Sequence, residues 1–237
     1  MKAMILAAGL GTRLRPFTNE NPKALAIING KSLLQRNIEY LASFGIKDVI
    51  VNVHHFSDKI IALINSNNGF GSNITISDET DEILETGGGL KKAGWFFEAE
   101  PFVLLNVDIL TDMDIKKMVD AHLTLKPLAT LAIADRKTTR YFLFDELNIL
   151  CGWKNTNTND QKVNREALKY FEKAFWGIHI ISPEIFSLIT QEGKFSIIDV
   201  YMNIVKTHNI MGFEDNQSKF IDVGKPESIA IAEEIFS

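Results

Sequence analysis

The sequence predicts an α/β fold in which a mostly parallel, mixed β-sheet carries helices on both faces. From about residue 4 to residue 135, short apolar runs alternate with stretches of helical apolar spacing,. The first of these runs is continuously apolar, as expected for a strand that is covered on both faces. The length of 237 residues suits one large domain,.

Composition excludes several classes of protein. Hydrophobic residues make up 46% of the chain and charged residues 23%, which is typical of a globular domain and not of a disordered chain,. The net charge of −5, without a local Lys/Arg cluster, argues against a nucleic-acid partner,. No apolar run approaches the ~18 residues of a membrane span. The single cysteine, Cys151, cannot form an internal disulfide, so we expect a cytoplasmic protein,.

The first strand is expected at 4–8 and ends at Gly9. The apolar stretch 3–10 superficially resembles a signal peptide, but it is short, and Arg13 and Arg15 follow where a cleavage site should lie,. Ser32 is expected to cap a helix that Gly45 ends,. The elements that follow are expected as strands at 49–53, 73–77, 102–105 and 129–134 and helices at 59–64 and 114–123, with a Gly87–Gly89 turn before a helix-like stretch to 97.

Beyond residue 135 the alternation of strands and helices changes. A hairpin is expected over 141–144 and 149–152, and the polar segment 155–164 is expected to be a mobile loop,. Strand-like sequence resumes at 171, with a strand at 175–181. The remaining elements are expected as a helix from Pro183, a helix at 196–206, a strand at 220–223 and a terminal helix opened by Pro226,.

Three informative loops, 9–22, 85–89 and 106–112, all follow predicted strands. Parallel sheets bind ligands at the carboxyl ends of their strands, so these loops predict the site. In the first loop, Gly9 and Gly11 would let backbone N–H groups face an anion, and Arg13 would add a guanidinium fork for a polyphosphate,. The dinucleotide-binding fingerprint is incomplete, since Leu14 stands in place of its third glycine,. A glycine-rich turn with solvated arginines is the alternative.

The segment L-A-A-G-x-G-x-R-x-R-P at 6–16, followed by Pro22-Lys23, resembles the signature of the sugar-1-phosphate nucleotidylyltransferases. The resemblance continues at 84–89 (LETGGG), 106–108 (NVD), 175–178 (FWGI) and 221–227 (IDVGKPE), so it spans essentially the whole chain. Among subgroups, the E-T-G-G-G turn and the segments 140–145, 152–153 and 195–199 are most similar to N-acetylmuramate-1-phosphate uridylyltransferases.

The resemblance implies a Rossmann-like sheet of the nucleotide-diphospho-sugar transferase type within a single domain, 1–237. Residues 1–135 would form its nucleotide-binding half and 136–237 its sugar-phosphate-binding half. It also implies transfer of a nucleotidyl group from a nucleoside triphosphate, UTP, to a sugar 1-phosphate, N-acetylmuramate 1-phosphate. Pyrophosphate would be released and a nucleotide sugar formed for cell-wall recycling.

The resemblance also implies the catalytic residues. Arg13 would hold the β- and γ-phosphates, and Lys23 would place its ammonium near the α-phosphate and the incoming sugar phosphate. Asp108 and Asp222, at the ends of distant strands, would hold Mg²⁺, which prefers one or two carboxylates plus phosphate oxygens and water. The alternatives are a surface lysine after a proline and two solvated strand-end carboxylates or helix caps.

The glycine turn would let a nucleobase lie against backbone, although it could also simply lead into a helix. Relatives often have glycine where Glu85 stands and alanine where Gly87 stands, which leaves the base preference open. The nucleotide-binding residues implied are Ala7, Ala8, Gly9, Gly11, Thr12, Glu85, Gly87 and Gly88.

The sugar phosphate would contact Asn106, Lys154, Trp176 and Asp199. Val107 and Trp176 depart from the family pattern, and Trp176 would reshape the sugar pocket if it faces the cleft. Lys154 could equally be a solvated loop lysine, and Asp199 could equally cap a helix.

Three alternatives to the uridylyltransferase remain open at this point. The first is a mannose-1-phosphate guanylyltransferase or another substrate-shifted relative, such as a phosphocholine cytidylyltransferase. The second is a non-catalytic nucleotide-binding paralogue, and the third, disfavoured by the missing glycine, is a dinucleotide oxidoreductase. Since only one helix follows the Asp222 strand, we expect no β-helix acyltransferase domain of the kind some relatives carry. The sequence predicts no oligomeric state.

Overall fold

The computed structural model of the chain describes residues 1–236. Its centre is a sheet of ten strands, and four neighbouring strands of this sheet are parallel. In spatial order these four strands are β6 (Phe102–Asn106), β1 (Lys2–Leu6), β4 (Asp48–Val53) and β5 (Asn73–Asp78).

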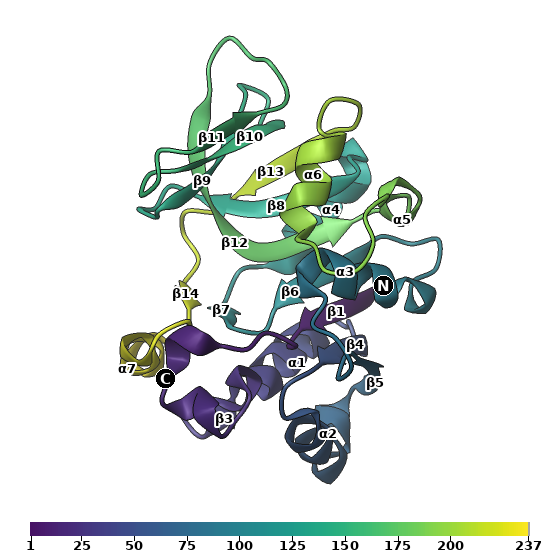
Figure 1. Cartoon of the computed structure of the whole chain (residues 1–237), viewed down its shortest axis with the longest axis vertical. Coiled ribbons are helices and arrows are strands. Elements are labelled where there is room, and N and C mark those ends of the chain that lie inside the picture. The colour runs from purple at the N-terminus through teal and green to yellow at the C-terminus, as the bar shows by residue number, and fades with distance from the viewer. Residues whose placement is uncertain (237) are drawn as a thin grey trace.

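The long strand β12 (Phe171–Ile181) joins this parallel half to the rest of the sheet. It runs antiparallel to β6 on one side and to β8 (Ala129–Ala134) and β9 (Arg140–Phe144) on the other, so β8 is not a neighbour of the parallel strands. Figure 1 shows the result as a lower parallel part and an upper antiparallel part. The remaining strands of the sheet are β10 (Leu150–Asn155) and β11 (Gln161–Val163) beyond β9, and β13 (Ile210–Glu214) beside β8.

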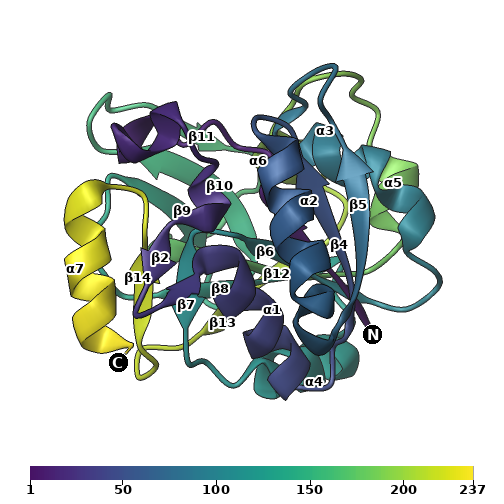
Figure 2. The same ribbon diagram turned by 90° about the horizontal axis from the view of Figure 1, so that it is seen from below.

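Helices cover both faces of the sheet, which confirms the predicted fold class. Along β1, Met4 packs into the core shared with α3, α5 and α6, whereas Ile5 packs into the core shared with α1, α2 and α4,. Figure 2 shows α1 and α2 on the face seen from below. The helices are α1 (Leu33–Ser43), α2 (Ser57–Ser66), α3 (Glu85–Lys92), α4 (Ile115–Leu125), α5 (Ile185–Leu188), α6 (Ile197–Ile204) and α7 (Pro226–Ile235).

Two small sheets lie beside the main one. They consist of β2 (Ile27–Ile28) with β3 (Lys31–Ser32), and of β7 (Ile109–Thr111) with β14 (Phe220–Asp222). A third apolar core, which includes Leu14, Leu110 and Ala232, packs α7 against them. Through this core the last helix of the chain is fixed close to the loop that follows the first strand.

The structure corrects three local expectations. The predicted loop 155–164 contains β11, which pairs with β10. The strands β2, β3, β7 and β13 were missed, because each is short or lacks apolar alternation. The first strand ends at Leu6, so Ala7 and Ala8 already belong to the loop beyond it. The Ser32 cap is confirmed, since its Oγ accepts a hydrogen bond from the Gln35 N–H at 3.0 Å.

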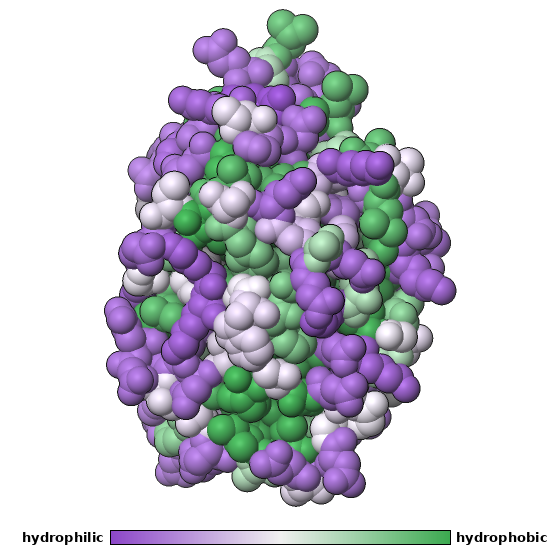
Figure 3. All heavy atoms as spheres, turned by 90° about the vertical axis from the view of Figure 1, so that its right-hand side faces the viewer, coloured by the Kyte–Doolittle hydropathy of each residue, from purple (hydrophilic) through white to green (hydrophobic). Residues whose placement is uncertain are grey.

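The molecular surface carries no extensive apolar face on the side shown in Figure 3, where apolar residues lie among hydrophilic ones and gather mainly toward the end that holds α2. Within residues 1–236, no helix combines the length and the apolar character needed to cross a membrane.

Two histidines are buried under the antiparallel half of the sheet. The Nδ1 of His179 lies 2.8 Å from the Tyr201 hydroxyl, and the Nδ1 of His122 lies 2.9 Å from the Thr130 hydroxyl. Burial lowers the pKa of His179 to about 3 and that of His122 to about 4. Both rings are therefore neutral in the folded protein at pH values well above these pKa values,.

We expect the free energy of unfolding to fall as the pH is lowered from 7.5 to 5.5. In this range the unfolded chain protonates both histidines, at a pKa of about 6.5, and the native chain does not, which costs about 1.4 kcal/mol for each. The substitution His179→Gln should remove about half of this dependence. Urea unfolding of the wild-type protein and the variant at several pH values measures the free energy of unfolding. An unchanged pH dependence in the variant would contradict a neutral, buried His179 in the folded protein.

Candidate active site

A cleft of about 400 Å³ lies beyond the carboxyl ends of the parallel strands, where the sequence places the site,. It is partly open to solvent, and its lining includes the small residues Ala7, Ala8, Gly9 and Gly11. The predicted residues that line it are Ala7, Ala8, Gly9, Gly11, Thr12, Arg13, Lys23, Glu85, Asn106 and Asp108.

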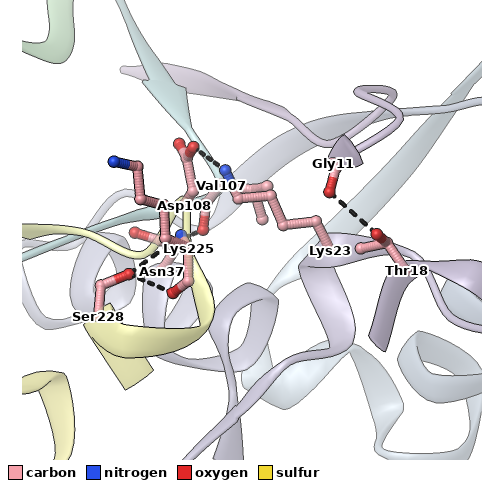
Figure 4. Close-up of polar contacts among 8 residues, drawn as sticks. All are labelled: Gly11, Thr18, Lys23, Asn37, Val107, Asp108, Lys225 and Ser228. Carbon is pink, nitrogen blue, oxygen red and sulfur yellow. Dashed lines mark hydrogen bonds and ion pairs between the residues drawn. The ribbon is translucent and has the colours of Figure 1, made fainter. Parts of the chain in front are cut away.

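The loop after β1 folds back on itself at Gly11. This residue has a φ of 59°, in the left-handed region, and a Cβ there would lie 2.9 Å from Thr18 Cγ2,. The Thr18 hydroxyl donates a hydrogen bond to the Gly11 carbonyl at 2.9 Å, as Figure 4 shows. A Cβ on Gly11 would also lie 3.0 Å from Lys23 Cβ, so the absence of a side chain at Gly11 lets this loop pack against Thr18 and Lys23.

Lys23 and Asp108 form an ion pair across the cleft (Figure 4). Lys23 begins a short 3-10 turn, Lys23–Leu25, after Pro22, and the buried Ala24 anchors that turn in the core. The side chains of Lys23 and Asp108 are only 12% and 17% exposed. The pair is therefore held in place by its surroundings and is not a freely moving surface contact.

Asp222 is brought to Asp108 by the pairing of β14 with β7. Asp222 lies opposite Ile109 in this pair, and the Val223 N–H donates a hydrogen bond to the Asp108 carbonyl at 2.9 Å. Burial raises the pKa of Asp222, and the nearby Asp108 carboxylate raises it further, while Lys23 acts in the opposite direction,. Within residues 1–236, the buried Asp222 Oδ1 has no hydrogen-bond partner.

Arg13 completes the group. A Cβ on Gly224 would lie 3.1 Å from Arg13 Nη2, so the guanidinium packs directly on this glycine, and its charge opposes the rise in the pKa of the neighbouring Asp222. The structure thus brings together Arg13 and Lys23 from the loop after β1, Asp108 from the segment between β6 and β7, and Asp222 from β14. Arg13, Lys23 and Asp108 line the cleft, and Asp222 lies directly beside them.

The carboxylates suit a divalent cation. Two adjacent aspartates, one with an unpartnered oxygen, match the preference of Mg²⁺ for one or two carboxylates completed by phosphate oxygens and water,. Across the described residues 1–236, no three His, Cys, Asp or Glu side chains gather as a complete metal cage. A metal bound here would therefore need ligands from the substrate.

Sequence reasoning missed Asn52, at the end of β4. Its Oδ1 accepts hydrogen bonds from the Ala7 N–H at 2.7 Å and the Ala8 N–H at 3.3 Å, and its Nδ2 donates to Glu79 Oε1 at 2.8 Å. Burial raises the pKa of Glu79,. The Ala7 and Ala8 amides are thus used to fix the loop. A polar residue in the otherwise apolar run 49–53 was the available signal.

Gly87 and Gly88 have a different role from the one predicted, because they lie inside α3 and not in a turn before it. A Cβ on Gly88 would lie 2.3 Å from the Gly193 carbonyl oxygen, and one on Gly87 would lie 2.5 Å from the Phe195 ring. Both N–H groups donate to the Phe195 carbonyl, at 2.9 and 3.2 Å. Neither glycine lines the cleft; they let α3 pack against the segment before α6.

Glu85, which begins α3, does line the cleft and has a φ of 60°. This left-handed conformation favours glycine, so a side chain at this position is held at a cost in backbone energy,.

A second cleft, of about 700 Å³, lies between the β9–β10 hairpin and the first turn of α6. Arg13 and Ser196 line both clefts, so the two are continuous. Asp199 and Asp222 face the second cleft. Ser196 caps α6 by accepting a hydrogen bond from the Ile198 N–H at 3.2 Å, so Asp199 is not the cap and its carboxylate is left at the cleft,.

Two predicted sugar-site residues do not reach either cleft. Lys154 forms an ion pair with Glu172 at 2.6 Å on the other side of the hairpin. Trp176 is 2% exposed and stacks on Phe220 with ring centroids 4.6 Å apart, in the core. Both assignments are therefore corrected, and Trp176 cannot reshape the sugar pocket directly.

Comparison with known proteins agrees with this geometry. Residues 2–143 match the nucleotidyl transferase family. The chain belongs to that family. The N-acetylmuramate alpha-1-phosphate uridylyltransferase of Caulobacter vibrioides is 31% identical to this nucleotidyl transferase over 98% of the chain and 95% of the relative. The predicted membership of the sugar-1-phosphate nucleotidyltransferases is confirmed.

Two further relatives of this nucleotidyl transferase differ in substrate. The mannose-1-phosphate guanyltransferase of Yarrowia lipolytica is 28% identical over 96% of the chain, which spans only 61% of that relative. The crystal structure of HddC from Yersinia pseudotuberculosis complexed with GMP-PN superposes with a TM-score of 0.81 at 26% identity, covering 100% of this chain and 99% of the other. The family is therefore shown, whereas the substrates of its members vary.

The packing role of Gly88 can be tested by Gly88→Ala. Its Cβ would meet a backbone oxygen that cannot move aside, so we expect a loss of about 3 kcal/mol in the free energy of unfolding,. Gly9→Ala is the matched control: a Cβ there meets no atom within 4 Å, so stability should stay within about 0.5 kcal/mol,. Chemical denaturation measures both, and equal stability of the two variants would refute the packing role.

Proposed function

We propose that this chain transfers the uridylyl group of UTP to N-acetylmuramate 1-phosphate, releasing pyrophosphate and forming a UDP-sugar in the cytoplasm for cell-wall recycling. The observation that carries the proposal is the close grouping of Arg13, Lys23, Asp108 and Asp222 at the carboxyl edge of the sheet, where the first three line the first cleft and Asp222 lines the second. The substrates themselves supply the nucleophile, a sugar phosphate oxygen, and the leaving group, pyrophosphate. The protein therefore mainly positions them and offsets their charge.

In this proposal Arg13 binds the β- and γ-phosphates, because its planar guanidinium fork matches phosphate oxygens and because it lines the first cleft,. Lys23 is placed near the α-phosphorus, where negative charge increases as the sugar phosphate attacks. In the absence of substrate Lys23 pairs with Asp108. A phosphate entering between them would compete for the same ammonium group.

Asp108 and Asp222 would hold Mg²⁺, with Asp222 contributing the Oδ1 that has no partner within residues 1–236. When bound, the ion would neutralise phosphate charge and orient the triphosphate. Glu85 and Thr12 line the same cleft and would contact the nucleotide. Asn106 and Asp199 would contact the sugar phosphate, one at each of the two connected clefts.

The choice of substrates is supported by the Caulobacter relative, which this chain matches along nearly its whole length. The mannose-1-phosphate guanyltransferases are longer than this chain and less identical to it. Pyrophosphate release should be measured across four nucleoside triphosphates and several sugar 1-phosphates, each with and without Mg²⁺. Turnover with GTP and mannose 1-phosphate alone would overturn the uridylyl assignment, and triphosphate binding without any release would indicate a non-catalytic paralogue.

We expect Lys23→Ala to lower kcat/KM by about 10²–10³, because it removes one charged donor from the transferring phosphoryl group. Lys154→Ala is the control, since this lysine is exposed on the far side of the hairpin and should leave kcat/KM within about twofold,. Thermal unfolding should confirm that both variants are folded. A folded Lys23→Ala enzyme with full turnover would refute the proposed role.

A further inference from the structure

The second cleft is lined by more cationic than acidic side chains. Three arginines line it: Arg13, Arg136 and Arg140. Within residues 1–236, none of them lies within 4.0 Å of a carboxylate oxygen. On the other side of the same hairpin, by contrast, Lys154 is paired with Glu172. None of the three cations that face the cleft therefore forms an ion pair with a described residue.

Arg140 is placed by the register of the hairpin. It lies opposite Asn155, and Phe142 lies opposite Trp153, so these four side chains share one face of β9 and β10,. All four line the cleft. No hydrogen bond from the Arg140 guanidinium to the described part of the chain is present. The exposed Arg140 side chain therefore leaves its donors free for a ligand at a cleft whose neighbouring wall is aromatic.

Arg136 also lines the second cleft, and it lies close enough to Asp222 to act on its charge. Its guanidinium carbon lies 4.7 Å from the centre of the Phe220 ring, and its Nη2 donates to the Phe175 carbonyl at 3.4 Å. Its charge opposes the rise in the pKa of Asp222. Arg136 is thus held by the protein and offsets an aspartate, whereas Arg140 offsets nothing within the chain.

The acidic side chains of the cleft do not balance this charge, since two carboxylates, Asp199 and Asp222, face three arginines. Asp222 lies beside Lys23 and lines the second cleft, so a sugar whose 1-phosphate lies near Lys23 would extend along this cleft toward Arg140. A guanidinium fork pairs with a carboxylate through two parallel hydrogen bonds, which gives direction as well as attraction.

We infer that Arg140 binds a carboxylate carried by the sugar, so that this cleft selects sugar 1-phosphates with an acidic substituent over neutral ones. The inference rests on the proposed function and makes it more specific. N-acetylmuramate carries such a group on its lactyl ether, and N-acetylglucosamine is the same sugar without it. Arg140 is a specificity-determining residue that contacts substrate and takes no part in the phosphoryl transfer.

The test compares N-acetylmuramate 1-phosphate with N-acetylglucosamine 1-phosphate, using UTP and Mg²⁺ and the full chain. Arg140→Ala should raise KM for the acidic sugar by about 10–100-fold, as expected for the loss of a charged hydrogen bond, and leave kcat nearly unchanged. For the neutral sugar, kcat/KM should change by less than about threefold. Arg140→Lys should restore part of the preference, since it keeps the charge and loses the fork.

Lys137→Ala is the matched control, because Lys137 is an exposed cation in the same loop that does not line the cleft. It should leave both substrates unaffected. Equal losses for the two sugars in Arg140→Ala, or an unchanged KM for the acidic sugar, would overturn the inference.

Failure of the proposed function gives a different result. A wild-type enzyme that turns over only neutral sugar phosphates refutes both the substrate assignment and the inference. A wild-type enzyme that prefers another acidic sugar phosphate, with a preference lost in Arg140→Ala, refutes the assignment to N-acetylmuramate alone.

Discussion

The pairing of β7 with β14 holds two carboxylates, Asp108 and Asp222, side by side at the cleft, and the Asp108 side chain is only 17% exposed. Like charges repel strongly at reduced dielectric, so this arrangement persists only because cations lie beside it. Lys23 pairs with Asp108, and Arg13 lies against Gly224, two residues beyond Asp222. The four charges match a ligand that carries both signs, namely a triphosphate with a divalent cation. Binding such a ligand would replace contacts within the protein by contacts with the substrate.

Much of this site could be predicted from the sequence because its signals are local. The apolar run that forms β1 stops at a glycine-rich loop, and Pro22-Lys23 follows within the same loop, so the positions of Gly11 and Lys23 depend on residues close in the chain. Asp108 follows β6, a strand of the parallel sheet, so its place at the carboxyl edge could be predicted, whereas Asp222 ends β14, which lies outside that sheet,. Their direct adjacency could not be predicted, because it depends on β7 and β14, each only three residues long.

The wrong site assignments share a physical cause, which is that long-range packing decides where a residue faces. Gly87 and Gly88 form the surface on which the segment with Phe195 packs, more than 100 residues along the chain. Trp176 is turned into the core beside a β-bulge of β12, where Gly177 has a φ of 73°,. Asn52 was overlooked because a buried asparagine in a strand indicates only that a partner exists. The partner, the Ala7–Ala8 backbone, is known only from the fold.

Successive side chains of a β-strand point to opposite faces, and this alternation decides which cations of the hairpin can contact the sugar. Lys154 and Asn155 are neighbours in the chain but point to opposite faces of β10, so one is neutralised by Glu172 and the other faces the cleft together with Arg140,. The chain as a whole has a net charge of −5, which would repel an anionic substrate at long range. Salt screens that repulsion beyond about 8 Å. Inside the second cleft the nearest charges dominate, and there three arginines face two carboxylates, Asp199 and Asp222. The local excess of positive charge, and not the overall composition, is what an acidic sugar phosphate would meet.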